Sequence, residues 1–102
     1  VLMFYINVCL TVKNEEDIPT VRELMKTIVS MCKEEKECLR IEVYHSQNDP
    51  KQFMLCEHWD RKESWEGHRN MPVFTDVYLA KVLPLVDREP HISDLVAQHN
   101  AS

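Results

Sequence analysis

The sequence predicts an α+β domain with a ferredoxin-like split βαβ arrangement, and two observations lead to this class. Apolar and polar residues alternate with the period of a β-strand in residues 3–13, 38–45 and 52–59. Apolar residues recur with the helical period in residues 18–32 and again between residues 60 and 82. Together with a last strand near the C-terminus, this order is that of an antiparallel sheet whose helices cover one face.

Length and composition favour a single globular domain over residues 1–102. A chain of 102 residues has the length of one domain, and its 44% hydrophobic and 28% charged content is ordinary for a globular protein. The single glycine argues against linkers and low-complexity segments. We expect order over about residues 3–96, followed by a flexible polar tail.

The charge pattern makes nucleic acids and membranes unlikely partners. The formal net charge is −5 and the lysines and arginines are scattered, so no basic stripe is available for phosphates. No apolar run reaches the roughly 20 residues of a membrane span. The first residues, "VLMFYINVCL", lack the basic leader and cleavage site of a signal peptide, and we therefore expect a cytoplasmic protein.

The four cysteines are expected to be buried free thiols rather than disulfides. No pair forms a CxxC motif, and all four lie within apolar periodic segments. They are Cys9, Cys32, Cys38 and Cys56.

The first strand has one wholly apolar face and one mixed face. Its apolar face consists of Phe4, Ile6, Val8, Leu10 and Val12. In the helix that follows, Asp17 is the predicted N-cap and Pro19 lies in the first turn. The residues that follow the helical period are Ile18, Val21, Met25, Ile28 and Cys32, flanked by Leu24 and Val29, and the helix is expected to end near the charged run "KEEKE".

The middle of the chain predicts a hairpin of residues 38–45 and 52–59 joined by "SQNDPK". One face of the first strand should hold Leu39, Ile41, Val43 and His45. The matching face of the second should hold Phe53, Leu55, Glu57 and Trp59.

Two helical stretches and a strand are expected after the hairpin. Asp60 and Glu63 have the spacing of a capping box for a helix that runs to Asn70. Pro72 interrupts this helix, and Pro84 closes the next one. The stripe of that next helix should contain Val73, Phe74, Val77, Tyr78 and Val82, and a last strand is expected around residues 91–96.

The sheet face without helices needs a cover. It carries Tyr5, Asn7 and Cys9 together with alternate residues of the hairpin, a mixture of apolar and polar side chains. A second copy of the same face is a natural partner for such a surface. We therefore expect a homodimer through the sheet face.

The best functional candidates lie where the third strand meets the second helix. An inward Glu57 on an apolar face needs either a partner or a raised pKa, which would make it a proton acceptor. The structural alternative is that it binds an arginine. His68 could be a general base or could orient a bound oxygen, and its alternative is a solvated helix histidine.

The aromatic and polar residues near this corner have two interpretations each. Trp59 and Trp65 could form the wall of a pocket for a planar ligand, or could simply belong to the core. Tyr5 and Asn7 could hydrogen-bond a substrate carbonyl or hydroxyl, or could serve the dimer interface.

The sequence predicts neither a metal nor an organic cofactor. There is no HExxH motif, and His45, Glu57, His58 and His68 have no recognised ligand spacing. A single glycine also excludes a glycine-rich phosphate loop of the familiar nucleotide-dependent enzymes.

One long segment resembles a known family. It reads "CLRIEVYHSQNDPKQFMLCEHWDRKESWEGH" and is followed by "MPVF" and "VLPLV". It combines an "NDP" hairpin, an E-x-W motif and a histidine nine residues after the tryptophan. From about Met3 to His91 the chain resembles the antibiotic biosynthesis monooxygenase family of small dimeric α+β barrel proteins.

The resemblance implies a pocket between the sheet and the helices of each subunit. It also implies that a small phenol or quinol is the substrate and is oxidised by O2 without metal, flavin or haem. In that scheme Glu57 or His68 promotes deprotonation, and Trp59 and Trp65 shape an aromatic cavity. We include Phe74 and Tyr78 of the next helix among the substrate-binding candidates.

Positions at which this chain differs from the family pattern bear on the reaction that we expect. Haem-degrading relatives have a tryptophan at the position of His68 and a haem-ligating histidine at that of Tyr78, so haem degradation is disfavoured. Glu37 replaces a glycine found in many relatives before the second strand. Two alternatives stay open: a non-oxidative isomerase or degradation enzyme for a small, autoinducer-type carbonyl compound, and a dimeric binding module without catalysis.

Overall fold

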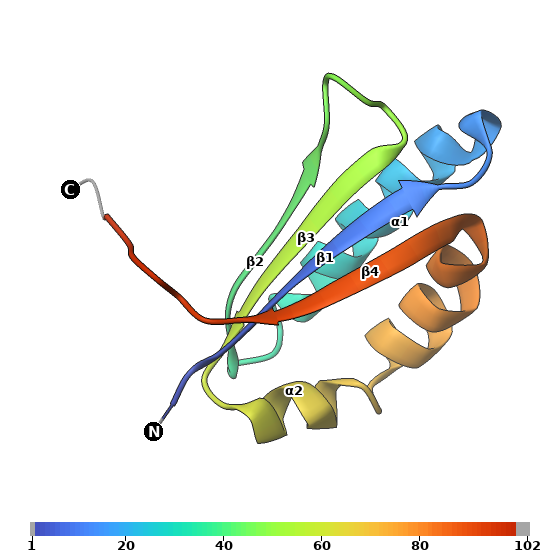
Figure 1. The fold of residues 1–102 in the computed structure, drawn as a ribbon. Coiled ribbons are helices and arrows are strands. Elements are labelled where there is room, and N and C mark those ends of the chain that lie inside the picture. The colour runs from blue at the N-terminus through green and yellow to red at the C-terminus, as the bar shows by residue number, and fades with distance from the viewer. Residues whose placement is uncertain (1, 100–102) are drawn as a thin grey trace.

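The computed structural model describes residues 2–99 and contains one antiparallel sheet with all of its helices on one face (Figure 1). This arrangement confirms the predicted α+β, ferredoxin-like class. The elements in chain order are β1 (Phe4–Val12), the 3₁₀-helix η1 (Glu15–Asp17), α1 (Ile18–Cys32), β2 (Cys38–His45), β3 (Gln52–Trp59), α2 (Lys62–His68), the π-helix η2 (Val73–Val82), the 3₁₀-helix η3 (Leu83–Leu85) and β4 (Val86–Ser93).

The sheet has the strand order β2-β3-β1-β4, with every neighbouring pair antiparallel. The central strands β1 and β3 pair Val8 with Leu55, and the edge strand β4 places Pro90 opposite Val8. Proline suits an edge strand because it has no N–H to donate to a further strand. The central strands are therefore the ones best able to position buried functional groups.

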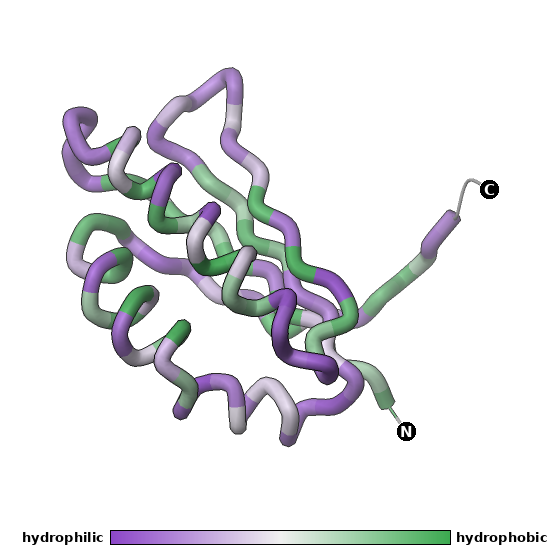
Figure 2. Tube along the Cα trace, turned by 180° about the vertical axis from the view of Figure 1, so that it is seen from behind, coloured by the Kyte–Doolittle hydropathy of each residue, from purple (hydrophilic) through white to green (hydrophobic). Residues whose placement is uncertain are grey.

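The core lies between the helices and one face of the sheet. The five alternate residues of β1 from Phe4 to Val12 are buried, as the period-two pattern predicts. In the predicted stripe of α1, Ile18 is half-buried and the other four residues are buried and pack on this face. Figure 2 shows the resulting alternation of hydrophobic and hydrophilic residues along α1.

The hairpin contains a β-bulge that the sequence pattern did not predict. Cys38 pairs with Trp59 and Arg40 pairs with His58, so Leu39 is an extra residue in β2. Leu39 is 53% exposed and does not join the face of Ile41, contrary to the prediction. Cys38 takes that position instead, because a one-residue shift exchanges the two faces of a strand.

The cysteine prediction is correct for pairing and partly wrong for burial. All four thiols are free, but only Cys32 is buried. Cys9, Cys38 and Cys56 are half-buried: Cys9 and Cys56 lie on the sheet face without helices, and Cys38 lies on the other face in the edge strand β2.

One of the two predicted helix caps is found in the structure. Asp17 is the N-cap residue of α1 and Pro19 lies in the first turn, as expected, although the Asp17 side chain makes no capping hydrogen bond. The second helix begins at Lys62 and ends at His68, so the predicted capping box is wrong. Asp60 Oδ1 instead accepts a hydrogen bond from Ser64 Oγ at 2.5 Å, one turn into the helix.

The third helical stretch is a π-helix. Its buried residues are Val73, Tyr78 and Val82, whereas Phe74 and Val77 are half-buried. The spacing of five between Val73 and Tyr78 suits the wider turn of a π-helix, in which hydrogen bonds join residues five apart. Such helices are rare and occur frequently at functional sites.

The last strand begins five residues earlier than predicted and ends at Ser93 rather than Val96. Val86 pairs with Val12, and Tyr5 pairs with Ser93. The pattern was obscured because most residues of this edge strand are exposed and its N-terminal half, "VDREP", is polar. Residues 94–99 continue away from the domain without regular secondary structure (Figure 1). The last three residues of the predicted flexible tail, 100–102, lie outside the described residues.

Within residues 2–99 we find no helix with both the length and the apolar character needed to cross a membrane.

The bulge predicts an unequal response of two leucines to truncation. Leu10→Ala should lower the free energy of unfolding by about 2–5 kcal/mol, since Leu10 is fully buried. Leu39→Ala should change it by no more than about 0.5 kcal/mol, because the bulge exposes Leu39. Urea denaturation measures both values, and comparable losses would contradict the observed register of β2.

Candidate functional site

A small internal cavity lies between the sheet and the helices, at the corner where β3 leads into α2. Its volume is about 20 Å³, enough for roughly one water molecule. The polar side chains that line it are Glu57, His68, Arg88 and Cys32, and the aromatic ones are Trp65, Phe74 and Tyr78. Aliphatic residues of α1, β2, β3 and η2 complete the wall. The cavity therefore combines ionisable groups with apolar and aromatic surroundings.

Glu57 is a buried carboxyl group on the apolar face of β3, with 6% of its surface exposed. Its Oε1 accepts a hydrogen bond from Trp59 Nε1 at 3.0 Å. Burial raises the pKa of Glu57, and the Trp59 hydrogen bond and the neighbouring His68 and Arg88 only partly oppose this effect. The structure thus gives Glu57 the raised pKa that was one of its two predicted states.

The second prediction for Glu57 was an ion pair with an arginine, and this pair is not observed within residues 2–99. The arginine that lines the cavity is Arg88, and its Nε donates a hydrogen bond to Tyr78 Oη at 2.9 Å. No salt bridge joins Glu57 to any cation in the described part of the chain. Glu57 is therefore held by an indole N–H rather than by a permanent positive charge.

His68 is buried rather than solvated, with 7% of its surface exposed. Its Nδ1 lies 2.8 Å from Oε2 of Glu35, which is itself largely buried. When Nδ1–H donates to this carboxylate, Nε2 is left with a lone pair that can accept a proton. The pair has the arrangement of a base and the acidic group that orients it.

Glu35 is the residue of this candidate site that the sequence analysis missed. It lies in the run "KEEKE" after α1, which we interpreted only as the polar end of that helix. Three glutamates occur within this run, and no pattern distinguishes the one that faces inward. The partnership joins residues 33 positions apart, so only the tertiary fold reveals it.

The predicted aromatic residues have different places in the site. Trp59 is completely buried and lies beside His68, with ring centroids 4.8 Å apart, but it does not line the cavity. Trp65 lines it and stacks on Phe4 at 5.0 Å. Phe74 and Tyr78 also line it, and their centroids are 5.4 Å apart.

A cation closes the outer side of the aromatic wall. The Arg69 guanidinium carbon lies 5.3 Å from the centroid of Trp65 and 5.6 Å from that of Phe74. Both distances are within the range of a cation–π interaction. Arg69 thus bridges α2 and η2 over the two half-buried rings.

Tyr5 and Asn7 are not brought to this cavity. They alternate with the buried residues of β1 and therefore lie on the sheet face without helices. Asn7 Nδ2 donates to Ser93 Oγ at 3.1 Å, and the Tyr5 ring lies 4.7 Å from that of His58. Their contact with a substrate stays a prediction. It would require a substrate at the sheet face without helices rather than in this cavity.

Three potential metal ligands meet beside the cavity, although their sequence spacing gave no hint of it. The donor atoms of Cys32, Glu35 and His68 lie within 4.8 Å of one another, and this combination of S, O and N donors suits zinc. Burial and the neighbouring carboxyl groups raise the pKa of the Cys32 thiol, which opposes the thiolate that a metal needs. The expectation of a metal-free protein stays a prediction.

Comparison with known proteins identifies the family. The sequence profile of the antibiotic biosynthesis monooxygenase family matches residues 3–78, which include Glu35, Glu57 and His68. The chain belongs to the antibiotic biosynthesis monooxygenase family. This assignment confirms the resemblance seen in the sequence and indicates a monooxygenase-like enzyme that acts on a small molecule. A search of curated protein sequences gives no match.

Solved structures with the same fold support the architecture. A Bacteroides thetaiotaomicron protein described as a possible oxidoreductase has a TM-score of 0.84 and 22% identity, with 91% of this chain and 97% of that chain covered. A structure named antibiotic biosynthesis monooxygenase has a TM-score of 0.80 and 21% identity, with 91% and 99% covered. A Pseudomonas aeruginosa protein has a TM-score of 0.82 and 14% identity, with 94% and 97% covered.

The raised pKa of Glu57 predicts a pH-dependent gain of stability in Glu57→Gln. Above about pH 4.3 the unfolded chain loses the proton that the folded protein still holds, so this carboxyl lowers stability as the pH rises. Glutamine can still accept the Trp59 hydrogen bond but does not ionise. The variant's Tm should match that of the parent near about pH 4 and exceed it increasingly as the pH rises, until the pH passes the raised pKa of Glu57 in the folded protein.

A matched control is Glu66→Gln on the exposed side of α2. Its Tm difference from the parent should not follow this pH profile. A Tm difference for Glu57→Gln that is constant over this pH range would show that burial does not hold the proton on Glu57.

Proposed function

We propose that this protein is a cofactor-independent monooxygenase that oxidises a small phenolic or quinol substrate with O2 in the cavity of Glu57 and His68. One observation carries the proposal: His68, which is hydrogen-bonded to Glu35, and the carboxyl of Glu57 line the same small cavity together with three aromatic side chains. Such a site can remove a proton from a phenol while excluding water from the reaction.

The first step uses His68 as the base. The substrate hydroxyl gives its proton to Nε2 of His68, and the carboxylate of Glu35 stabilises the imidazolium that forms. The electron-rich phenolate transfers an electron to O2, and the two radicals combine to form a carbon–oxygen bond at a ring carbon that still carries hydrogen. The product of this step is a peroxide anion on the ring.

Glu57 serves the second step as the proton donor, and burial favours its protonated form by raising its pKa. It donates its proton to the peroxide anion and, as a carboxylate, then accepts the hydrogen of the ring carbon as a proton. The O–O bond breaks, the ring becomes a quinone, and the departing hydroxide takes the proton from His68 to form water. One oxygen atom enters the product, and both side chains return to their starting states.

The remaining residues of the site bind the substrate and position Glu57. The indole N–H of Trp59 fixes Glu57, while Trp65, Phe74 and Tyr78 offer aromatic surfaces to the substrate ring. A cavity of about 20 Å³ is smaller than any aromatic substrate. Substrate entry therefore requires outward movement of half-buried Trp65 and Phe74, which Arg69 holds together.

The same proposal includes a homodimer through the sheet face. Cross-strand rows on this face contain Tyr44, Met54 and Cys9, and then Cys56 and Asn7. Tyr44 is 50% exposed and Met54 is 49% exposed, so the face offers apolar surface between polar groups. A two-fold partner would cover this surface and close two sheets into a barrel.

The chief alternative uses the same residues without oxygen. A base and a protonated carboxyl on either side of a small carbonyl compound could move a proton between two of its carbon atoms, as an isomerase does. Dependence of turnover on O2 distinguishes the two reactions.

Oxygen uptake tests the proposed chemistry. With a panel of reduced naphthoquinols and polyphenols, metal-stripped protein should show saturable uptake above autoxidation. His68→Ala should lower turnover roughly 10²-fold or more, because the base is lost. Lys81→Ala, on the exposed side of η2, is the control and should leave the rate unchanged. Conversion of a carbonyl compound without oxygen uptake would favour the isomerase, and full activity of His68→Ala would remove it as the base.

Sedimentation tests the proposed dimer with two methionines of similar exposure. Met54→Glu places a charge at the centre of the sheet face and should shift the protein from dimer to monomer at micromolar concentration. Met71→Glu changes a residue that is 44% exposed between α2 and η2 and should leave the dimer intact. A monomeric parent protein would refute the dimer directly.

A further inference from the structure

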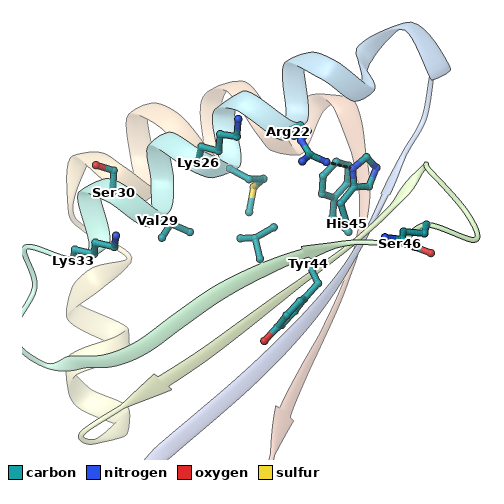
Figure 3. A pocket seen from close by; sticks show the side chains of 12 residues that line it. Arg22, Lys26, Val29, Ser30, Lys33, Tyr44, His45 and Ser46 are labelled. Atoms are coloured by element: carbon teal, nitrogen blue, oxygen red, sulfur yellow. Dashed lines mark hydrogen bonds between the residues drawn. The ribbon is translucent and has the colours of Figure 1, made fainter.

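A second hollow lies between α1 and β2, and it is much larger than the cavity of Glu57 and His68 (Figure 3). We call it the α1–β2 groove. Its volume is about 600 Å³, within the range of roughly 300–1,000 Å³ that is usual for small-molecule sites. It shares no lining residue with the smaller cavity, so the two are separate places on the same side of the sheet.

The floor of the α1–β2 groove is apolar. Met25 and Val29 of α1 face Val43 of β2 and Phe53 of β3 there. Met25 and Phe53 are buried, whereas the two valines are half-buried. An apolar body that covers this floor would remove hydrophobic surface from water.

The rim of the groove is basic, in contrast to the net charge of −5 of the whole chain. Arg22, Lys26 and Lys33 lie along one edge of α1, and Figure 3 shows them above the floor. Lys26 Nζ is 3.0 Å from Glu23 Oε2, so its charge is partly compensated. Within residues 2–99, Arg22 and Lys33 form no salt bridge, which leaves two cations for a ligand.

A hydrogen-bonded chain holds Arg22 in place at one end of the groove. Arg22 Nη1 donates to His45 Nδ1 at 2.7 Å, and His45 Nε2 donates to the Pro50 carbonyl at 2.6 Å. The imidazole also stacks on Phe53, with centroids 4.0 Å apart and planes 9° from parallel. Since both ring nitrogens are used, one as acceptor and one as donor, His45 is neutral here. The guanidinium keeps further N–H groups that can bind a carboxylate through two parallel hydrogen bonds.

We propose that the α1–β2 groove binds a small amphipathic carboxylate. The carboxylate lies on Arg22, with Lys33 adding positive charge along the edge, and the apolar body covers Met25, Val29 and Val43. A preorganised arginine beside an apolar floor favours this ligand over a neutral amphiphile or a compact, fully polar anion. The site is independent of the proposed oxygenation, because none of its residues borders the cavity of Glu57 and His68.

Octanoate is the probe, and octanol is its neutral counterpart. Titration of isotopically labelled full-length protein, followed by amide chemical shifts, should show saturable octanoate binding at residues of α1 and β2. Octanol should bind at least about tenfold more weakly, because it lacks the charge-assisted hydrogen bonds. Arg22→Gln/Lys33→Gln should weaken octanoate binding to a similar extent.

The control variant is Lys13→Gln/Lys81→Gln, which removes the same charge from exposed positions outside the groove and should bind octanoate as the parent does. Equal binding by both double variants, or shifts confined to the cavity of Glu57 and His68, would overturn the proposal. So would absence of octanoate binding together with dissociation of a dimer in Arg22→Gln/Lys33→Gln, because a second copy would then occupy the groove. The octanoate titration tests the α1–β2 groove, and oxygen uptake tests the cavity of Glu57 and His68. Failure of one proposal can therefore be distinguished from failure of the other.

Discussion

The arrangement of the site depends on the burial of one carboxyl group. Glu57 occupies a position of β3 whose neighbours on the same face, Leu55 and Trp59, are buried apolar residues. A buried carboxylate is costly unless it is paired, and the partner supplied here is only the indole N–H of Trp59. Burial raises the pKa of Glu57 and so favours its neutral form. The aromatic wall from α2 and η2 surrounds the carboxyl group with apolar surface, which disfavours its anionic form.

The second determinant of the site joins parts of the chain that are distant in sequence. Glu35 follows α1, His68 ends α2, and the hydrogen bond between them forms because both segments lie on the same face of the sheet. The Trp59 ring beside His68 comes from the end of the central strand β3. A base therefore becomes oriented only when the strand order β2-β3-β1-β4 has brought the sheet and both helices together.

The sequence predicted those elements in which burial of one face repeats apolar residues at a regular period. It did not predict the places where the backbone departs from that period. Alternation in β1 and the stripe of α1 were predictable because each element presents a single face to the core. The bulge at Leu39 was not, since it moves one residue out of the register that alternation assumes. The start of β4 was missed because an edge strand with exposed, charged residues carries little hydrophobic pattern. Within the site, Glu57 and His68 were predictable from a local motif, whereas Glu35 and Arg88 come from separate segments without any such motif.

Charge balance explains why a protonated Glu57 suits a reaction that passes through a phenolate. Glu35 already supplies one carboxylate next to His68, and its charge is one of the influences that raise the pKa of Glu57. A second carboxylate at Glu57 would oppose the formation of an anionic substrate at close range. In the proposed reaction, proton transfer to His68 would create an imidazolium beside the phenolate, and Arg88 on the cavity wall would add a further positive charge. The burial that lowers stability at Glu57 is thus the same feature that would make an anionic intermediate tolerable in this cavity.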